Sequence, residues 1–173
     1  MNTTLRSASL IVFFYLLTIS ATFAQNLKLD EIATCITSKN YPDCLFEMVE
    51  AKGFYRIDKQ YLPYCDRVIY VLQKADKPVM FVNPVICPKP QRSEIYPVRV
   101  KTELELQFQK GGQAQFESMS AQIRKIAKLI QPENGMVSEP KSNETKRVYR
   151  HEATGITYVI IKSSPASFIY LLK

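Results

Sequence analysis

Few side chains in this sequence stand in a pattern that suggests acid–base or nucleophilic catalysis. His151 is the single histidine, so a Ser-His-Asp or Cys-His system would have to use it. A catalytic histidine needs a nucleophile within hydrogen-bond reach, and none stands beside it in the run 146–151. We therefore expect His151 to be a solvated or paired side chain at the end of a strand.

Two carboxylates form the other candidate pair for acid–base chemistry. Glu103 and Glu105 lie in a segment that alternates apolar and polar side chains, so they share one face of a strand. Glycoside hydrolysis uses such a pair when the surroundings separate the roles of acid and base. Arg99 and Lys101 share that face, and alternating charges on a wet strand face usually pair across strands. A hydrolase that acts on envelope polymers through these carboxylates is therefore the alternative hypothesis.

The familiar signatures of catalysis and metal binding are absent from the sequence. It contains no G-x-S-x-G elbow, P-loop, H-E-x-x-H motif or dinucleotide fingerprint. Its cysteines lack the short spacing of a zinc site, and one histidine is too few to replace them. We predict no catalytic residue, no metal and no cofactor, and hence a non-enzymatic protein.

Four cysteines favour two disulfides in an oxidising compartment. They are Cys35, Cys44, Cys65 and Cys87. Spacing alone allows three pairings, but local patterns favour Cys35–Cys44 and Cys65–Cys87. The segments 68–72 and 79–82 read as a β-hairpin whose extension brings the second pair into line, and two helices around a break at 40–43 bring the first pair together.

The last three predicted strands carry an aromatic set that could recognise a partner. The sequence has ten tyrosines and no tryptophan. Tyrosines are common anchors at binding surfaces because an apolar ring carries a polar tip, although many are half-buried strand formers. A possible binding face on an uncovered side of the sheet comprises Arg147, Tyr149, Tyr158 and Tyr170.

Hydrophobic periodicity predicts the elements that would position these residues. Helices are expected at 29–38, after the break at 40–43, and at 113–131, and the proline-rich segment 84–97 is expected to be a loop. Strands are expected at 68–72, 79–82, 96–108, 146–150, 156–161 and 167–172. A helix followed by three strands thus appears twice, in repeat-like halves 25–110 and 111–173.

The predicted fold class is α+β, with two α-β-β-β units forming one antiparallel sheet of about six strands and helices packed on one face. This order resembles the tandem helix-plus-sheet layout of secreted inhibitor proteins such as the β-lactamase inhibitory protein. The resemblance implies a concave sheet that grips a partner enzyme. It concerns element order alone and transfers no residue roles.

Residues 1–24 have the pattern of a cleaved signal peptide. The cation Arg6 precedes the apolar run 10–19, and the small residues Thr22 and Ala24 suit a peptidase that cuts before Gln25. The apolar stretch is shorter than the roughly 18 residues of a membrane-spanning helix, so we expect no membrane anchor after cleavage. Residues 25–173 then form a single domain that is periplasmic or secreted, with a signal of bacterial type.

The formal charge of +7 is scattered along the chain. Nucleic-acid binders usually gather such charge into a patch with interleaved aromatics, so we expect no specific nucleic-acid binding. The leading hypothesis is an exported, non-enzymatic binding or interaction module. Its partner would be an unknown protein or envelope polymer.

Overall fold

The computed structural model describes residues 27–62, 65–74, 76–93, 95–96, 98–130 and 145–173. The predicted signal peptide (1–24) and its cleavage site between Ala24 and Gln25 lie outside these residues. Two disulfides confirm the predicted pairing, Cys35–Cys44 and Cys65–Cys87. Within the described part of the chain, no helix is long and apolar enough to span a membrane.

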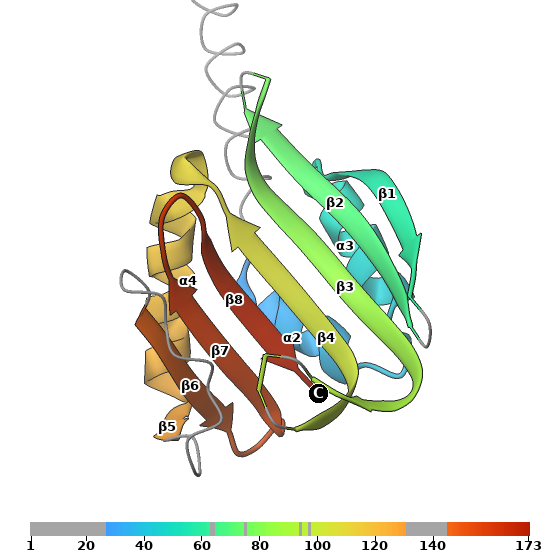
Figure 1. The fold of residues 1–173 in the computed structure, drawn as a ribbon, viewed down its shortest axis with the longest axis vertical. Helices are drawn as coiled ribbons and strands as arrows, with labels where there is room; N and C mark the ends of the chain where they lie inside the picture. Colours follow the sequence, from blue (N-terminus) through green and yellow to red (C-terminus); the bar gives the residue numbers. More distant parts are fainter. Residues whose placement is uncertain (1–26, 63–64, 75, 94, 97, 131–144) are drawn as a thin grey trace, which may run out of the picture.

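One antiparallel sheet organises the described residues, as the α+β prediction requires, and its strands run in the order β1-β2-β3-β4-β8-β7-β6-β5 (Figure 1). Its eight strands are β1 (Tyr55–Tyr61), β2 (Asp66–Lys74), β3 (Lys77–Arg92), β4 (Arg99–Phe108), β5 (Lys128–Ile130), β6 (Thr145–His151), β7 (Ile156–Lys162) and β8 (Ser167–Leu172). Two four-stranded meanders meet at the β4–β8 pair, so β1 and β5 are the two edges. The expectation of about six strands, three in each unit, is wrong.

The two strands that the sequence did not predict are these two edges. All seven residues of β1 are exposed, so this strand lacks the alternation of buried and exposed side chains on which the prediction depends. At the other edge, the helix expected at 113–131 is shorter: α4 (Gln113–Ile126) ends where Ala127 becomes extended. Residues Lys128–Ile130 then pair with β6 as β5, a strand too short to show a period of its own.

Strand β3 continues through much of the segment 84–97, which we expected to be a loop. Proline is tolerated in a sheet where its missing N–H is not needed for the ladder. Pro84 still lies opposite Leu104 of β4, whereas Pro88 and Pro90 fall in a register shift beyond the last β2 partner. The prolines therefore interrupt the ladder locally without ending the strand.

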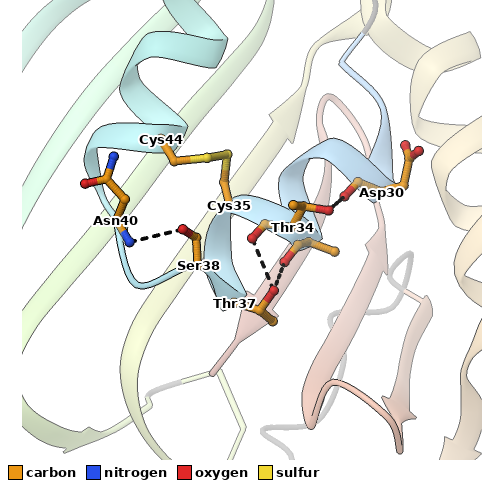
Figure 2. Close-up of a disulfide and its surroundings, with 8 residues drawn as sticks. Asp30, Thr34, Cys35, Thr37, Ser38, Asn40 and Cys44 are labelled. Atoms are coloured by element: carbon orange, nitrogen blue, oxygen red, sulfur yellow. Dashed lines mark hydrogen bonds between the residues drawn. A yellow bond between two sulfur atoms is a disulfide. The ribbon is translucent and has the colours of Figure 1, made fainter.

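Three α-helices of the described residues lie behind the sheet in the view of Figure 1: α2 (Leu29–Thr37), α3 (Asp43–Ala51) and α4. The Cys35–Cys44 disulfide links α2 to α3, with Cα atoms 5.4 Å apart (Figure 2). Between the cysteines, Ser38 Oγ accepts a hydrogen bond from the Asn40 N–H at 3.0 Å, which helps to shape the turn. This turn and the disulfide together hold the two short helices as one unit.

A glycine pair separates β4 from α4, as expected, through the short 3-10 helix η1 (Lys110–Gly112). Gly112 lies so close to β3 that a Cβ there would be 2.4 Å from the carbonyl oxygen of Val79. Only glycine permits this approach without moving the backbone of β3.

The two faces of the sheet carry separate cores. In β8, Ile169 and Leu171 belong to the main core, which also contains residues of all three helices. Tyr170 and Leu172 belong to a smaller core on the other side, because successive side chains of a strand point to opposite faces. We call the side of the main core the helix face and the other side the open face.

Strand β4 confirms the alternation read from the sequence. Its buried side chains are Val100, Thr102, Leu104, Leu106 and Phe108, and the residues between them are exposed or half-buried. On the open face, Ile95 and Tyr96 of the connector after β3 pack against the smaller core. Lys146 Nζ fastens this connector by donating a hydrogen bond to the Ile95 carbonyl at 2.7 Å.

Substitution Leu106→Ala should lower the free energy of unfolding by about 2–5 kcal/mol, because truncation of a fully buried leucine leaves a cavity. Leu129→Ala is the matched control, since Leu129 is 54% exposed and surface substitutions usually change stability by less than about 0.5 kcal/mol. Urea unfolding followed by circular dichroism measures both values. Equal losses in the two variants would contradict the position of the main core.

Candidate binding surface

The structure does not bring together the four side chains of the binding face expected from the sequence. Tyr149 and Tyr158 are direct cross-strand partners and are buried in the main core on the helix face. Arg147 precedes them on β6 and is exposed. Tyr170 is buried in the smaller core on the open face. The tyrosines of the last strands therefore serve two different cores.

Tyr170 instead meets the carboxylates that were considered for catalysis. In the sheet register, Glu105 lies between Asn83 on one side and Tyr170 on the other. Asn83 Nδ2 donates a hydrogen bond to Glu105 Oε1 at 2.7 Å, and Tyr170 bonds to the same carboxylate. Glu103 Oε2 accepts a hydrogen bond from Ser93 Oγ at 2.8 Å. These five residues form a central polar cluster on the open face.

The central polar cluster is electrostatically constrained. Burial, followed by the charge and hydrogen bond of Glu105, raises the pKa of Tyr170 far above its usual range. Arg67 on β2 adds a compensating positive charge. Its Nε atom and Oδ1 of Asn83 are buried without a hydrogen-bond partner in the described structure. Carboxylate oxygens of Glu103 and Glu105 already accept hydrogen bonds from Asn83 and Ser93. The arrangement therefore favours a structural role for the two carboxylates, in which they fix the segment after β3 to the sheet.

The edge strand β1 is the most exposed apolar part of the described chain. Of six large hydrophobic side chains that are exposed among the described residues, four lie between residues 55 and 62. They are Tyr55, Ile57, Tyr61 and Leu62. Exposed apolar side chains on an edge strand make this segment the candidate interaction surface, because such side chains lose contact with water when a partner binds.

Tyr61 is the most exposed of the four, at 78%. Lys59 Nζ lies 4.7 Å from the centre of its ring and forms an ion pair of 3.1 Å with Asp66 of β2. The hydrogen bond and charge of Asp66 raise the pKa of Lys59, so the cation over the ring is kept charged. The ring is thus held at the surface with one face toward a cation.

An open pocket of about 640 Å³ lies beside Leu62, at the corner where β2 begins. It is lined by Leu62, Cys65, Asp66, Ile86, Pro88, Lys89 and Gln91. The Cys65–Cys87 disulfide, with Cα atoms 4.3 Å apart, fixes β2 to β3 at this corner. We call the exposed side chains of residues 55–62 and this pocket together the β1 corner.

The sequence contained a partial signal for the β1 corner. Tyr55, Ile57 and Tyr61 stand at even spacing, as on one side of a strand, but charged residues separate them and a register shift occurs between Arg56 and Asp58. The Cys65–Cys87 disulfide was predicted from the first hairpin, but the sequence analysis did not connect it with a surface. Because residues 55–61 are largely polar, their sequence did not predict a strand there.

No family model matches the chain, and no curated protein or solved structure matches it either. Among the described residues, no group of three or more His, Cys, Asp or Glu side chains is placed to hold a metal ion. The case for a function therefore depends on the surfaces of this chain alone.

Substitution Tyr170→Phe should reduce the amount by which the free energy of unfolding falls at alkaline pH. An unfolded tyrosine ionises near pH 10, whereas the raised pKa of Tyr170 keeps it protonated in the folded state. Above pH about 10 the folded state then binds more protons than the unfolded state, so the free energy of unfolding falls as pH rises. Tyr70 and Tyr158, whose pKa values are raised to about 12, add to this fall and remain in the variant.

Urea unfolding between neutral pH and pH about 11 measures this dependence. Tyr61→Phe is the control, because its side chain is 78% exposed. The slope of stability against pH should be shallower in Tyr170→Phe than in the wild type and in the control. Three identical slopes would show that Tyr170 is not held in its neutral form.

Proposed function

We propose that the protein is an exported, non-enzymatic binding module that holds an extended segment of a partner protein along β1. The observation that carries the proposal is the concentration of exposed apolar side chains on this edge strand. The two disulfides support a location in an oxidising compartment, the periplasm or the extracellular space.

Strand addition is the binding mode that suits this surface. The outer side of an edge strand presents unpaired N–H and C=O groups, and an added strand satisfies them while pockets select its side chains. Among the described strands β1 pairs only with β2, and the pocket of about 640 Å³ lies past its end, at Leu62. A large side chain of the partner would enter this pocket between the charges of Asp66 and Lys89.

The same strand carries features that limit its pairing with copies of itself. A register shift separates Arg56 from Asp58, and Asp58 and Lys59 place opposite charges next to each other in the strand. Bulges and charges are common devices against uncontrolled edge-to-edge association. The bulge and the charges leave only a short part of β1 for pairing. A partner segment of a few residues, with one side chain bound in the pocket, suits this length.

A hydrolase of envelope polymers that uses Glu103 and Glu105 is the second candidate. Its support is the position of both carboxylates in the central polar cluster with Tyr170. Loss of a measured hydrolytic activity in Glu103→Gln, with an unchanged unfolding midpoint, would support it over the binding module.

Substitution Ile57→Lys should weaken partner binding about tenfold or more, because it puts a charge where apolar surface is buried and one buried aliphatic side chain contributes about 1.5–3 kcal/mol. Ile126→Lys is the control, since Ile126 is exposed to nearly the same extent, 49% against 51%, but lies at the end of α4.

The purified, disulfide-bonded protein captures partners from envelope and medium extracts of the source organism, and calorimetry measures the affinity for the retained protein.

Hydrogen–deuterium exchange then locates the contact. Binding should slow exchange of β1 amides, since strand addition occupies outward N–H groups. A partner that binds the Ile57→Lys and Ile126→Lys variants equally, or leaves β1 exchange unchanged, would contradict the proposed site.

A further inference from the structure

A second pocket lies on the helix face, far from β1 in the strand order, and its analysis does not depend on the proposed function. It has a volume of about 240 Å³ and lies between α4 and the paired strands β6 and β7. On α4 its wall is Glu117, Ser120 and Arg124, which share one side of the helix by their spacing. On the sheet, the cross-strand pairs Thr145–Lys162 and Arg147–Ile160 form the opposite wall.

The charge of this pocket is positive. Three cations line it: Arg124, Arg147 and Lys162. Glu117 compensates one of them, through an ion pair of 2.7 Å with Lys162, and the cations accordingly lower the pKa of Glu117. Within the described residues, neither arginine forms a salt bridge. With three cations and one carboxylate, the lining of the pocket has a net charge of +2.

Ser120 gives an independent indication of a ligand. Its side chain is 99% buried, at 1% exposure, and Oγ has no hydrogen-bond partner in the described structure. A buried hydroxyl without a partner destabilises the fold, and a helical serine usually avoids this by donating to a carbonyl one turn earlier. Here the unsatisfied hydroxyl belongs to the wall of a basic pocket, where an anion would accept its hydrogen bond.

We propose that this pocket binds a phosphate group. A phosphate monoester carries a charge of about −1.5 to −2 at neutral pH and three acceptor oxygens, which matches the net charge of the lining. Guanidinium groups bind such oxygens in bidentate fashion, and Ser120 and Thr145 add hydroxyl donors. A carboxylate would neutralise only half of the excess charge.

The size of the pocket agrees with this ligand. One water molecule takes about 30 Å³ in the liquid, so a cavity of about 240 Å³ has room for a phosphate group and a few atoms of an attached molecule. Free phosphate and the phosphate group of an ester present the same chemistry to these side chains. The test therefore compares the two sources directly.

The test is a titration of the purified, disulfide-bonded protein with inorganic phosphate, glycerol phosphate or acetate at constant ionic strength, followed by two-dimensional NMR. We expect saturable shifts of the Ser120, Arg124 and Arg147 amides with both phosphates and not with acetate. Tighter binding of glycerol phosphate would identify an ester as the ligand, and equal or weaker binding would identify the free anion. A response to acetate equal to that of phosphate, or no saturable shift, would overturn the proposal.

Variants separate a site from general attraction to a basic protein. Arg147→Gln should weaken phosphate binding about tenfold, since a hydrogen bond to a charged group contributes about 1.5–3 kcal/mol. Arg99→Gln is the control, because Arg99 is an exposed cation on β4 outside the pocket. Equal affinities in these two variants would overturn the proposal.

Ser120→Ala tests the buried hydroxyl. It should weaken phosphate binding while leaving the free energy of unfolding unchanged or raised, because it removes a polar atom that has no partner in the empty pocket. A loss of stability without a loss of affinity would show that the hydroxyl serves the fold and not a ligand.

Discussion

The β4–β8 ladder joins two meanders that would otherwise each expose a second edge. Its register sets Leu104 opposite Leu171 and Leu106 opposite Ile169, so the middle of the main core lies on this seam. A shift of β8 by one residue against β4 would turn Ile169 and Leu171 to the open face, while Leu104 and Leu106 stayed in the main core. The same register sets Glu105 opposite Tyr170, which means that one pairing determines both the apolar and the polar centre of the sheet.

The open face of the sheet is covered in one half and uncovered in the other. Near β6 to β8 the connector after β3 covers the smaller core, held by Lys146 through Ile95 and by Ser93 through Glu103. No described helix or strand lies in front of β1 and β2 in Figure 1. The apolar side chains of β1 remain exposed on both sides of the strand, since Tyr55 pairs with Val71 whereas Tyr61 pairs with Asp66, two residues before Val68 of the main core. The proposal of a partner surface at the β1 corner therefore rests on the exposed edge itself, which the Cys65–Cys87 disulfide holds in one shape.

Elements with a regular local pattern of apolar residues could be predicted from the sequence. Elements whose position depends on pairing between distant strands could not. The alternation in β4 could be read directly from the chain. Both disulfides followed from predicted local elements, a hairpin for Cys65–Cys87 and two neighbouring helices for Cys35–Cys44. The edges β1 and β5 leave no such pattern: one is wholly exposed and the other has three residues. The binding face expected from Tyr149, Tyr158 and Tyr170 depended on registers that a sequence does not contain. One-residue differences in register place Tyr170 on the opposite face from the other two.

The two proposed sites differ in the forces that would hold their ligands. Strand addition at β1 depends on backbone hydrogen bonds and apolar contact, which salt affects little, whereas the pocket beside α4 depends on charges that salt screens. In the strand order, β1 and β7 are five strand spacings apart, or roughly 24 Å at about 4.8 Å each. That separation is about three times the Debye length of roughly 8 Å at physiological ionic strength. Direct electrostatic coupling is therefore negligible, and one site could influence the other only by a movement of the sheet, which the close-packed β4–β8 seam between them resists.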